Sequence, residues 1–176
     1  MRNEVSLTVT VPVPASLAFR VWAEQTAYPE WLEHLAAVEA TGDRTHRWTL
    51  CLPDGRAVTW ETETTVFREN ERIAWSSFAG DLVTYGQVRI ESLGPRRSRV
   101  HIRRYHGVGR GQDPTVVQRV FGDPAAKLKR DVVAYVGRLR RLAGGAAAPA
   151  PRPGAVRGAG RGTGRAAGRP LTAEGP

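Results

Sequence analysis

The stretch from Asp123 to Leu142 constrains the fold of this chain more than any other part of the sequence. Its apolar residues recur at steps of three and four, which places them along one face of an α-helix. Asp123 can accept hydrogen bonds from the first free N–H groups, and Pro124 suits the first helical position. The pattern places Lys127 and most of the other basic residues of this stretch on the other sides of the helix, away from the apolar face. The predicted apolar face consists of Ala125, Leu128, Val132, Tyr135, Val136, Leu139 and Leu142.

Most of the chain before this helix has the pattern of β-strands. In the first strand, Val5 to Val11, apolar residues alternate with Ser and Thr, as in a strand with one buried face. Turn residues such as Pro53-Asp54-Gly55 separate the later strands. The predicted strands cover residues 5–11, 37–40, 45–52, 56–68, 72–78, 84–92 and 98–105.

Three short helices are also predicted. Ala15–Ala23 and a segment from Tyr28 to about Leu35 lie between the first two strands, and Pro114–Phe121 precedes the long helix. A long amphipathic helix needs a sheet to bury its apolar face, and the sheet needs a cover. The sequence therefore predicts an α+β fold in which a seven-stranded, curved antiparallel sheet surrounds the C-terminal helix.

The chain divides into two parts by composition. Residues 1–142 carry 21 basic and 16 acidic side chains and are long enough for one domain with a core. Residues 143–176 are mainly Ala, Gly, Pro and Arg, which bury too little apolar surface to offset ordering entropy, so we predict a disordered tail. Its spaced Arg residues favour either contact with RNA or another anionic surface, or a tolerated low-complexity extension.

Other features exclude several classes of protein. The N-terminus lacks the pattern of a signal or transit peptide, and no apolar run approaches the length of a membrane span. A lone Cys51 cannot form an internal disulfide, so we expect a cytoplasmic protein. The four His residues lack the spacing of zinc ligands, so we expect no metal or cofactor. The second short helix is too short and too acidic to read DNA.

Several segments resemble a known superfamily. Three segments are similar to the corresponding parts of SRPBCC proteins, namely VPVPASLAFRVWAEQTAYPEWLEHL, ENERIAWSS and SRVHI. These include the polyketide cyclase/dehydrase and START-like families, among them coenzyme-Q-binding proteins. The resemblance covers about Val5–Leu142 and implies the helix-grip (START-like, Bet v 1-like) fold, with an apolar cavity between sheet and helix. It also implies binding of a hydrophobic small molecule.

A cavity of this kind is expected to be mainly apolar with a few polar groups. The resemblance implies that the short second helix, which carries Trp31, borders the mouth of the cavity. Thr62 and Thr64 share a strand face with Trp60. The alternative for Trp31 is packing in the core or at its edge. The alternative for the two threonines is a position on a solvent-exposed strand face. The candidate ligand-binding residues are Trp31, Leu35, Trp60, Thr62, Thr64, Trp75, Val88, Ile90, Val100, Ile102, Arg104, Val117, Phe121, Leu128 and Val132.

Two residues of the last strand are candidates for catalysis. Arg104 shares a face with Ile102 and can hold an enolate, phenolate or carboxylate, or extend to the sheet edge. His101 lies on the opposite face, where acid–base work and simple solvation are the alternatives. The resembling aromatase/cyclases use an Arg at the position of Thr64 and a Tyr near His34-Leu35, and this chain has neither.

Three functions remain open at this stage. The first is a binding or carrier protein for a polyketide-, quinone- or lipid-like ligand. The second is a polyketide cyclase or dehydrase that folds an aromatic precursor. The third is a ribosome- or RNA-associated protein that uses the basic tail. The sequence does not identify the ligand or the oligomeric state.

Overall fold

The computed structural model describes residues 4–109 and 113–146. It has the predicted α+β architecture, with a seven-stranded antiparallel sheet in the order β1-β7-β6-β5-β4-β3-β2. The first and seventh strands pair directly at one edge of the sheet, so strands from opposite ends of the domain's sequence lie side by side there. The strands are β1 (Glu4–Val11), β2 (Ala37–Ala40), β3 (Thr45–Cys51), β4 (Ala57–Arg68), β5 (Arg72–Gly80), β6 (Leu82–Gly94) and β7 (Arg97–Val108).

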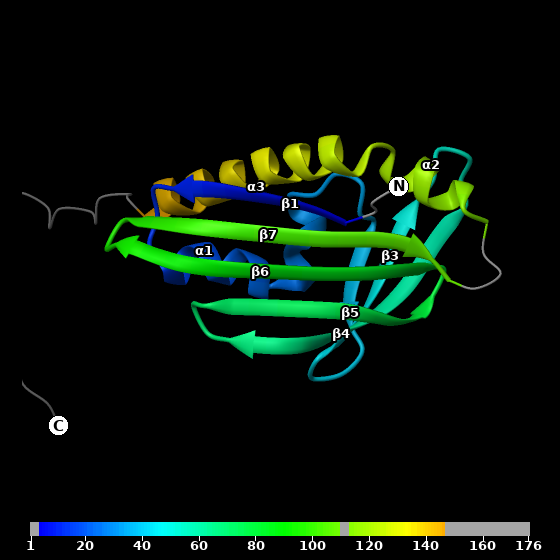
Figure 1. Cartoon of the computed structure of the whole chain (residues 1–176), viewed down its shortest axis with the longest axis horizontal. Helices are drawn as coiled ribbons and strands as arrows, with labels where there is room; N and C mark the ends of the chain where they lie inside the picture. The colour runs from blue at the N-terminus through cyan, green and yellow to red at the C-terminus, as the bar shows by residue number, and fades with distance from the viewer. Residues whose placement is uncertain (1–3, 110–112, 147–176) are drawn as a thin grey trace, which may run out of the picture.

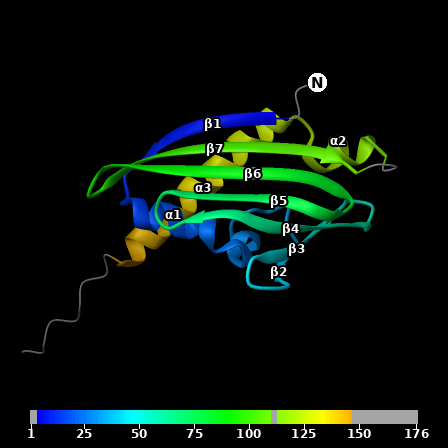
Figure 2. The same ribbon diagram turned by 60° about the horizontal axis from the view of Figure 1, so that its bottom comes forward.

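The helices lie on one side of this curved sheet. They are α1 (Ala15–Ala23), the 3₁₀ helix η1 (Gln25–Glu30), α2 (Thr115–Phe121) and α3 (Pro124–Ala146). Figure 1 shows α3 running along β1 and β7, and Figure 2 shows the same helix crossing the sheet obliquely on the side that carries α1. The Tyr135 hydroxyl of α3 donates a 2.8 Å hydrogen bond to the Ala18 carbonyl of α1, which joins the two helices.

The predicted helical face of α3 is confirmed at its centre. Asp123 accepts hydrogen bonds from the N–H groups of Ala125 and Ala126, as expected for a helix cap. Leu128, Val132, Tyr135 and Leu139 are buried in the core, whereas Ala125 is exposed. The assignment of Lys127 to an outer side of the helix is wrong, because its side chain is buried.

The second short helix differs from the prediction. It is a 3₁₀ helix that ends at Glu30, and residues up to Ala36 form turns rather than the expected helix to Leu35. Pro29 lies inside it and has no N–H to donate, so it cannot continue a regular α-helical hydrogen-bond ladder. The shorter helix leaves His34 on an irregular segment next to α3.

Helix α3 continues past Leu142, the last residue of the predicted helix, to Ala146. The rest of the basic tail, for which we predict disorder and consider contact with RNA, lies outside the described residues. Within the described ranges, no helix is long and apolar enough to cross a membrane. The cytoplasmic location expected from the lone Cys51 stays a prediction.

Candidate functional site

A row of aligned residues across four strands forms the base of the site. Thr64 of β4 pairs with Trp75 of β5, Trp75 pairs with Gly86 of β6, and Gly86 pairs with Arg104 of β7. Gly86 makes room for its neighbour, since a Cβ atom there would lie 2.2 Å from the Trp75 ring. The row places an indole ring and a guanidinium group side by side on the inner face of the sheet.

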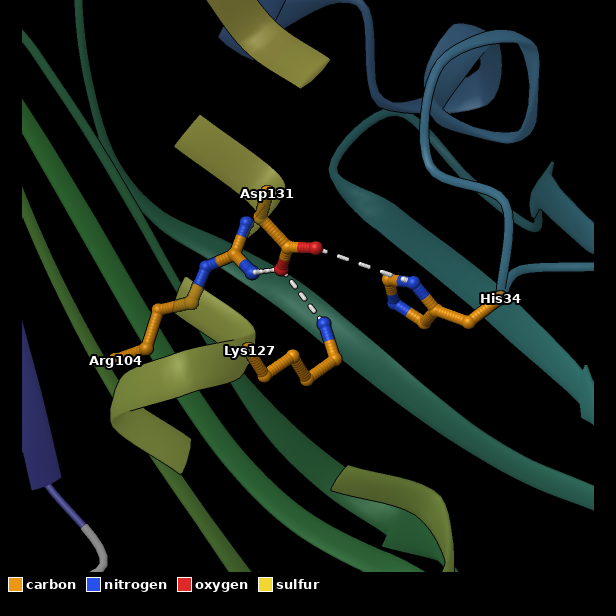
Figure 3. Close-up of polar contacts among 4 residues, drawn as sticks. All are labelled: His34, Arg104, Lys127 and Asp131. Carbon is orange, nitrogen blue, oxygen red and sulfur yellow. Dashed lines mark hydrogen bonds and ion pairs between the residues drawn. The ribbon is translucent and has the colours of Figure 1, made fainter. Parts of the chain in front are cut away.

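Arg104 points from this row toward α3, where it meets two charged residues one helical turn apart (Figure 3). Its Nη1 donates to Oδ2 of Asp131 at 2.6 Å, and the Nζ of Lys127 donates to the same oxygen at 2.6 Å. All three side chains are buried, with 7%, 4% and 5% of Arg104, Asp131 and Lys127 exposed. We refer to Arg104, Lys127 and Asp131 as the charged cluster.

The pKa values of Asp131 and Lys127 both lie below their usual values, for different reasons. Burial by itself raises the pKa of Asp131, but Arg104 and Lys127 outweigh that effect, so the pKa lies below its usual value. Burial and then the Arg104 cation lower the pKa of Lys127 to about 8, against the opposing effect of Asp131. At neutral pH the cluster therefore holds two cations and one anion.

Two histidines lie near the cluster and are neutral at pH 7. Burial and the charge of Lys127 lower the pKa of His34 to about 4. Its Nδ1 lies 4.0 Å from Oδ1 of Asp131 (Figure 3), a contact between a neutral ring and a carboxylate at this pH. Burial and the charge of Arg104 lower the pKa of His106 to about 3, and its ring packs on Phe121 at 4.0 Å between centroids. The buried site thus keeps one positive charge in excess.

These groups enclose a cavity between the sheet and the helices. Its volume is about 40 Å³, which is room for about three water molecules. One part of the wall is apolar and includes three indole rings, and the other part consists of polar and charged groups. The lining residues are Leu32, His34, Leu35, Trp48, Trp60, Trp75, Thr84, Tyr85, Arg104, His106, Phe121 and Lys127.

Three polar atoms of the cavity wall have no hydrogen-bond partner among the described residues. They are Oγ1 of Thr84, Nε of Arg104 and Nδ1 of His106, and all three side chains are more than nine-tenths buried. Buried polar atoms are nearly always paired in folded proteins, and leaving one unpaired costs about 1–3 kcal/mol. The wall is therefore suited to a guest that carries at least one oxygen.

A second hollow lies on the outside of the same wall. This outer groove has a volume of about 580 Å³ and runs between the segment after η1 and α3. Leu32, His34 and Lys127 line both the groove and the cavity. Val133 on the rim is an exposed apolar side chain, with 73% of its surface open to solvent. The two hollows are thus separated by only a few side chains.

The structure brings part of the predicted ligand-binding set to the cavity. Leu35, Trp60, Trp75, Arg104 and Phe121 line it. Trp31 lines the outer groove instead. The remaining apolar candidates pack in or against the core without lining the cavity, namely Val88, Ile90, Val100, Ile102, Val117, Leu128 and Val132.

The two predicted threonines are buried but bonded to protein groups. The Trp48 Nε1 donates to the Thr62 hydroxyl at 2.8 Å, and the Gln25 amide donates to the Thr64 hydroxyl at 3.3 Å. Neither threonine lines the cavity. The solvent-face alternative for them is wrong, because both side chains are buried.

His101 does not share the site with Arg104. Strand alternation places it on the outer face of β7, where it is exposed and lies 2.9 Å from the Thr8 hydroxyl. Of the two catalytic candidates, Arg104 alone lines the cavity. His101 therefore lies outside this cavity, on the opposite face of the sheet.

Sequence reasoning missed Lys127 and Asp131 as site residues. Their spacing of four puts them on one helix face, directly before Leu128 and Val132 of the apolar stripe. An oppositely charged pair at the border of an apolar helix face was the feature of the sequence that could have indicated this buried site. In the sequence, His34 was one of four histidines without the spacing of zinc ligands, and it lay near the position where the aromatase/cyclases carry a Tyr. Within residues 4–109 and 113–146, no group of His, Cys, Asp and Glu is arranged to hold a metal ion.

Solved structures of similar fold were found by comparison. A protein of Deinococcus radiodurans is 27% identical with a TM-score of 0.61, over 80% of this chain and 98% of that one. The Zhui aromatase/cyclase of a Streptomyces species is 19% identical, with a TM-score of 0.65 over 82% and 97%. A START superfamily protein of Mycobacterium smegmatis is 20% identical, with a TM-score of 0.63 over 79% and 98%.

A family model also matches this chain directly. The model described as polyketide cyclase / dehydrase and lipid transport matches residues 11–121, from the end of β1 to the end of α2. This range includes the whole sheet except most of β1, with the cavity wall up to Phe121. Together with the sheet topology and the long C-terminal helix, the match shows that the chain belongs to the polyketide cyclase / dehydrase and lipid transport family.

Proposed function

We propose that this protein binds a hydrophobic small molecule with at least one polar oxygen, and that it acts as a binding or carrier protein. The observation that carries the proposal is the division of the cavity wall. Trp48, Trp60 and Trp75 offer flat apolar surfaces, and the charged cluster offers donors with one positive charge in excess. Polyketide-, quinone- and lipid-like molecules combine these two properties.

The size of the cavity limits how such a ligand binds. A volume of about 40 Å³ accommodates a polar head but not a whole polyketide or lipid. The outer groove of about 580 Å³ shares Leu32, His34 and Lys127 with the cavity. We infer that the oxygen-bearing end occupies the cavity and that the apolar remainder lies in the groove, after these side chains shift.

Native mass spectrometry of the full chain, followed by organic extraction and identification of the released compound, tests this proposal. A stoichiometric apolar adduct that carries a carbonyl, phenol or carboxyl group is the expected result. Arg104→Met should weaken retention at least tenfold, whereas Arg103→Met on the outer face should not. If no compound is retained and a panel of fatty acids, quinones and aromatic polyketides fails to bind, the proposal is wrong.

A second candidate is a polyketide cyclase or dehydrase. It is favoured by the convergence of two cations and two neutral imidazoles on one cavity, with the Asp131 carboxylate bonded to both cations behind the wall. Such groups can move protons and hold an enolate. The Zhui similarity, at 19% identity, supports only the fold. Turnover of a poly-β-keto substrate that is lost in Arg104→Met and kept in His101→Gln is the expected result for this candidate.

A further inference from the structure

The use of lysine in this chain is unusual and points to one residue. The sequence contains 24 arginines and only two lysines, Lys127 and Lys129. Lys129 is exposed on α3, whereas Lys127 is buried and lines the cavity. A chain that uses arginine for almost every cation has placed one of its two primary side-chain amines inside its cavity.

Lysine and arginine differ chemically at such a position. The guanidinium group is not deprotonated in proteins, so it cannot act as an amine nucleophile. A lysine amine becomes nucleophilic when it is desolvated or lies close to another cation. Lys127 meets both conditions, because it is buried and because Arg104 donates to the same oxygen of Asp131.

We propose that Lys127 is a nucleophile that forms an imine with the carbonyl carbon of a small ketone or aldehyde in the cavity. The neutral amine attacks the carbonyl carbon and gives a carbinolamine. The carboxylate of Asp131, 2.6 Å from Nζ, takes a proton from the nitrogen and returns it to the departing hydroxyl. One carbon–nitrogen double bond forms and one molecule of water leaves, so the atoms balance.

The neighbouring groups suit this step. Arg104 stays charged and keeps Asp131 in place when the lysine loses its proton. Burial and then the charge of Arg104 lower the pKa of Lys127 to about 8, so a useful fraction of the amine is neutral near pH 7. The charge of Arg130 lowers the pKa of Lys127 further, whereas His34, whose own pKa is lowered to about 4, is neutral and adds no charge. Because Lys127 also lines the outer groove, a small carbonyl compound can approach from outside.

An imine in this site would activate the bound compound for reaction, which a protein that only binds its ligand does not require. Conversion of a carbonyl to a protonated imine makes the adjacent C–H bonds more acidic, which favours carbon–carbon bond formation in molecules with several carbonyl groups. The inference rests on the cavity of the proposed function but not on the identity of its natural ligand. Failure of the imine proposal can be distinguished from failure of the proposed binding function, because retention of an extracted ligand does not require a nucleophilic amine.

Reductive trapping of the full-length protein tests the proposal. The folded protein is incubated with acetone and sodium cyanoborohydride, digested, and analysed by peptide mass spectrometry. We expect Lys127 to gain one isopropyl group at least tenfold faster than Lys129, with a rate that rises with pH and is half-maximal near pH 8. Because the chain has only these two lysines, the exposed Lys129 is an internal reference in the same molecule.

Three variants separate the nucleophilicity of Lys127 from its simple exposure. Lys127→Arg keeps the cation beside Asp131 and should abolish labelling at position 127, whereas Lys129→Arg should leave labelling of Lys127 unchanged. Arg104→Met removes the neighbouring cation and should move the labelling midpoint of Lys127 to higher pH. Equal or slower labelling of Lys127 relative to Lys129, or a midpoint that Arg104→Met does not move, would overturn the proposal.

Discussion

Arg104 and Asp131 are joined by a 2.6 Å hydrogen bond that links strand β7 to helix α3 through the interior of the protein. The guanidinium group also lies over the Trp22 ring, 5.4 Å from its centroid, and so contacts α1 as well. Both charges are buried, so neither can be compensated by bulk water if the other is removed. This one pair therefore affects both the packing of α3 on the sheet and the charge of the cavity.

Replacement of Asp131 by Asn should destabilise the protein strongly. The change leaves Arg104 and Lys127 buried without a counter-charge, and removal of one partner from a buried ion pair costs about 3–5 kcal/mol. Urea unfolding at pH 7 measures the loss. The matched control is Glu30→Gln, which breaks the exposed 2.6 Å pair with Arg138 and should cost less than about 1 kcal/mol. Similar losses in both variants would contradict the role given to burial.

Replacement of Gly86 by Ala should disturb the cavity wall. The added Cβ would lie 2.2 Å from the Trp75 ring, so the ring must move away from its place beside Arg104. We expect a loss of about 1–3 kcal/mol in unfolding free energy, as for overpacked cores, with a change in tryptophan fluorescence and weaker ligand retention.

Gly137→Ala in α3 is the control for this substitution. Its Cβ would lie 3.5 Å from the nearest atom, Nη1 of Arg141, which is an ordinary contact. Alanine is better than glycine inside a helix by about 0.5–1 kcal/mol, so this variant should be slightly stabilised. If Gly86→Ala is as stable as Gly137→Ala and its fluorescence is unchanged, the close approach of Trp75 is not required.

Acid should destabilise the protein well before its carboxylates are protonated. The pKa of His106 is lowered to about 3 and that of His34 to about 4, from an ordinary 6.5. At pH values between the folded-state pKa and 6.5, each histidine is protonated in the unfolded chain but not in the folded protein. The free energy of unfolding that these histidines contribute is therefore fully present above pH 6.5 and falls as the pH decreases toward 4. The slope should approach about 1.4 kcal/mol per pH unit for each histidine.

The histidine contribution can be isolated with His106→Gln, whose side chain stays neutral throughout. Between pH 7 and pH 5 the wild-type protein should lose about 2 kcal/mol more unfolding free energy than the variant. Asp131, whose ordinary pKa is 3.8 and is lowered further, acts only at more acidic pH. Identical pH dependence in the two proteins would mean that the His106 ring accepts a proton freely in the folded state.

Ligand binding should slow hydrogen exchange in α2. The helix contributes Phe121 to the cavity wall and Val120 to the outer groove, so it borders both hollows. Short helices with few buried side chains open readily, and a ligand that contacts them should reduce that opening. Exchange measured by mass spectrometry with and without ligand should differ at residues 116–121 and not in the β1–β7 pairing at Val9 and Val100. Unchanged exchange in α2 when ligand is present would mean that the bound ligand does not contact this helix.

Much of the fold was predictable because it depends on local patterns. The alternation in β1, the turn at Pro53-Asp54-Gly55 and the cap at Asp123 all act over a few residues. The family resemblance then predicted how these elements assemble. The extent of η1 was predicted less well, because a proline and a few turn residues can support either an α-turn or a 3₁₀ turn.

The candidate site was predictable only where its residues are apolar or follow strand alternation. Trp60, Trp75 and Arg104 lie on inward-facing positions of their strands, and the structure places all three on the cavity wall. Thr62 and Thr64 have the same pattern, yet their hydroxyls are bonded to Trp48 and Gln25. Which inward-facing side chain borders empty space depends on partners from other elements.

The sequence by itself determined the type and order of the elements, since helix and strand periodicities, caps and turns are written within short windows of the chain. Only the tertiary structure decided that Lys127 and Asp131 face inward. On an isolated helix these residues would face water, because desolvating a charge is costly. Arg104, from a strand far away in the sequence, supplies the second cation that lets the Asp131 carboxylate be buried, and this contact exists only in the folded protein.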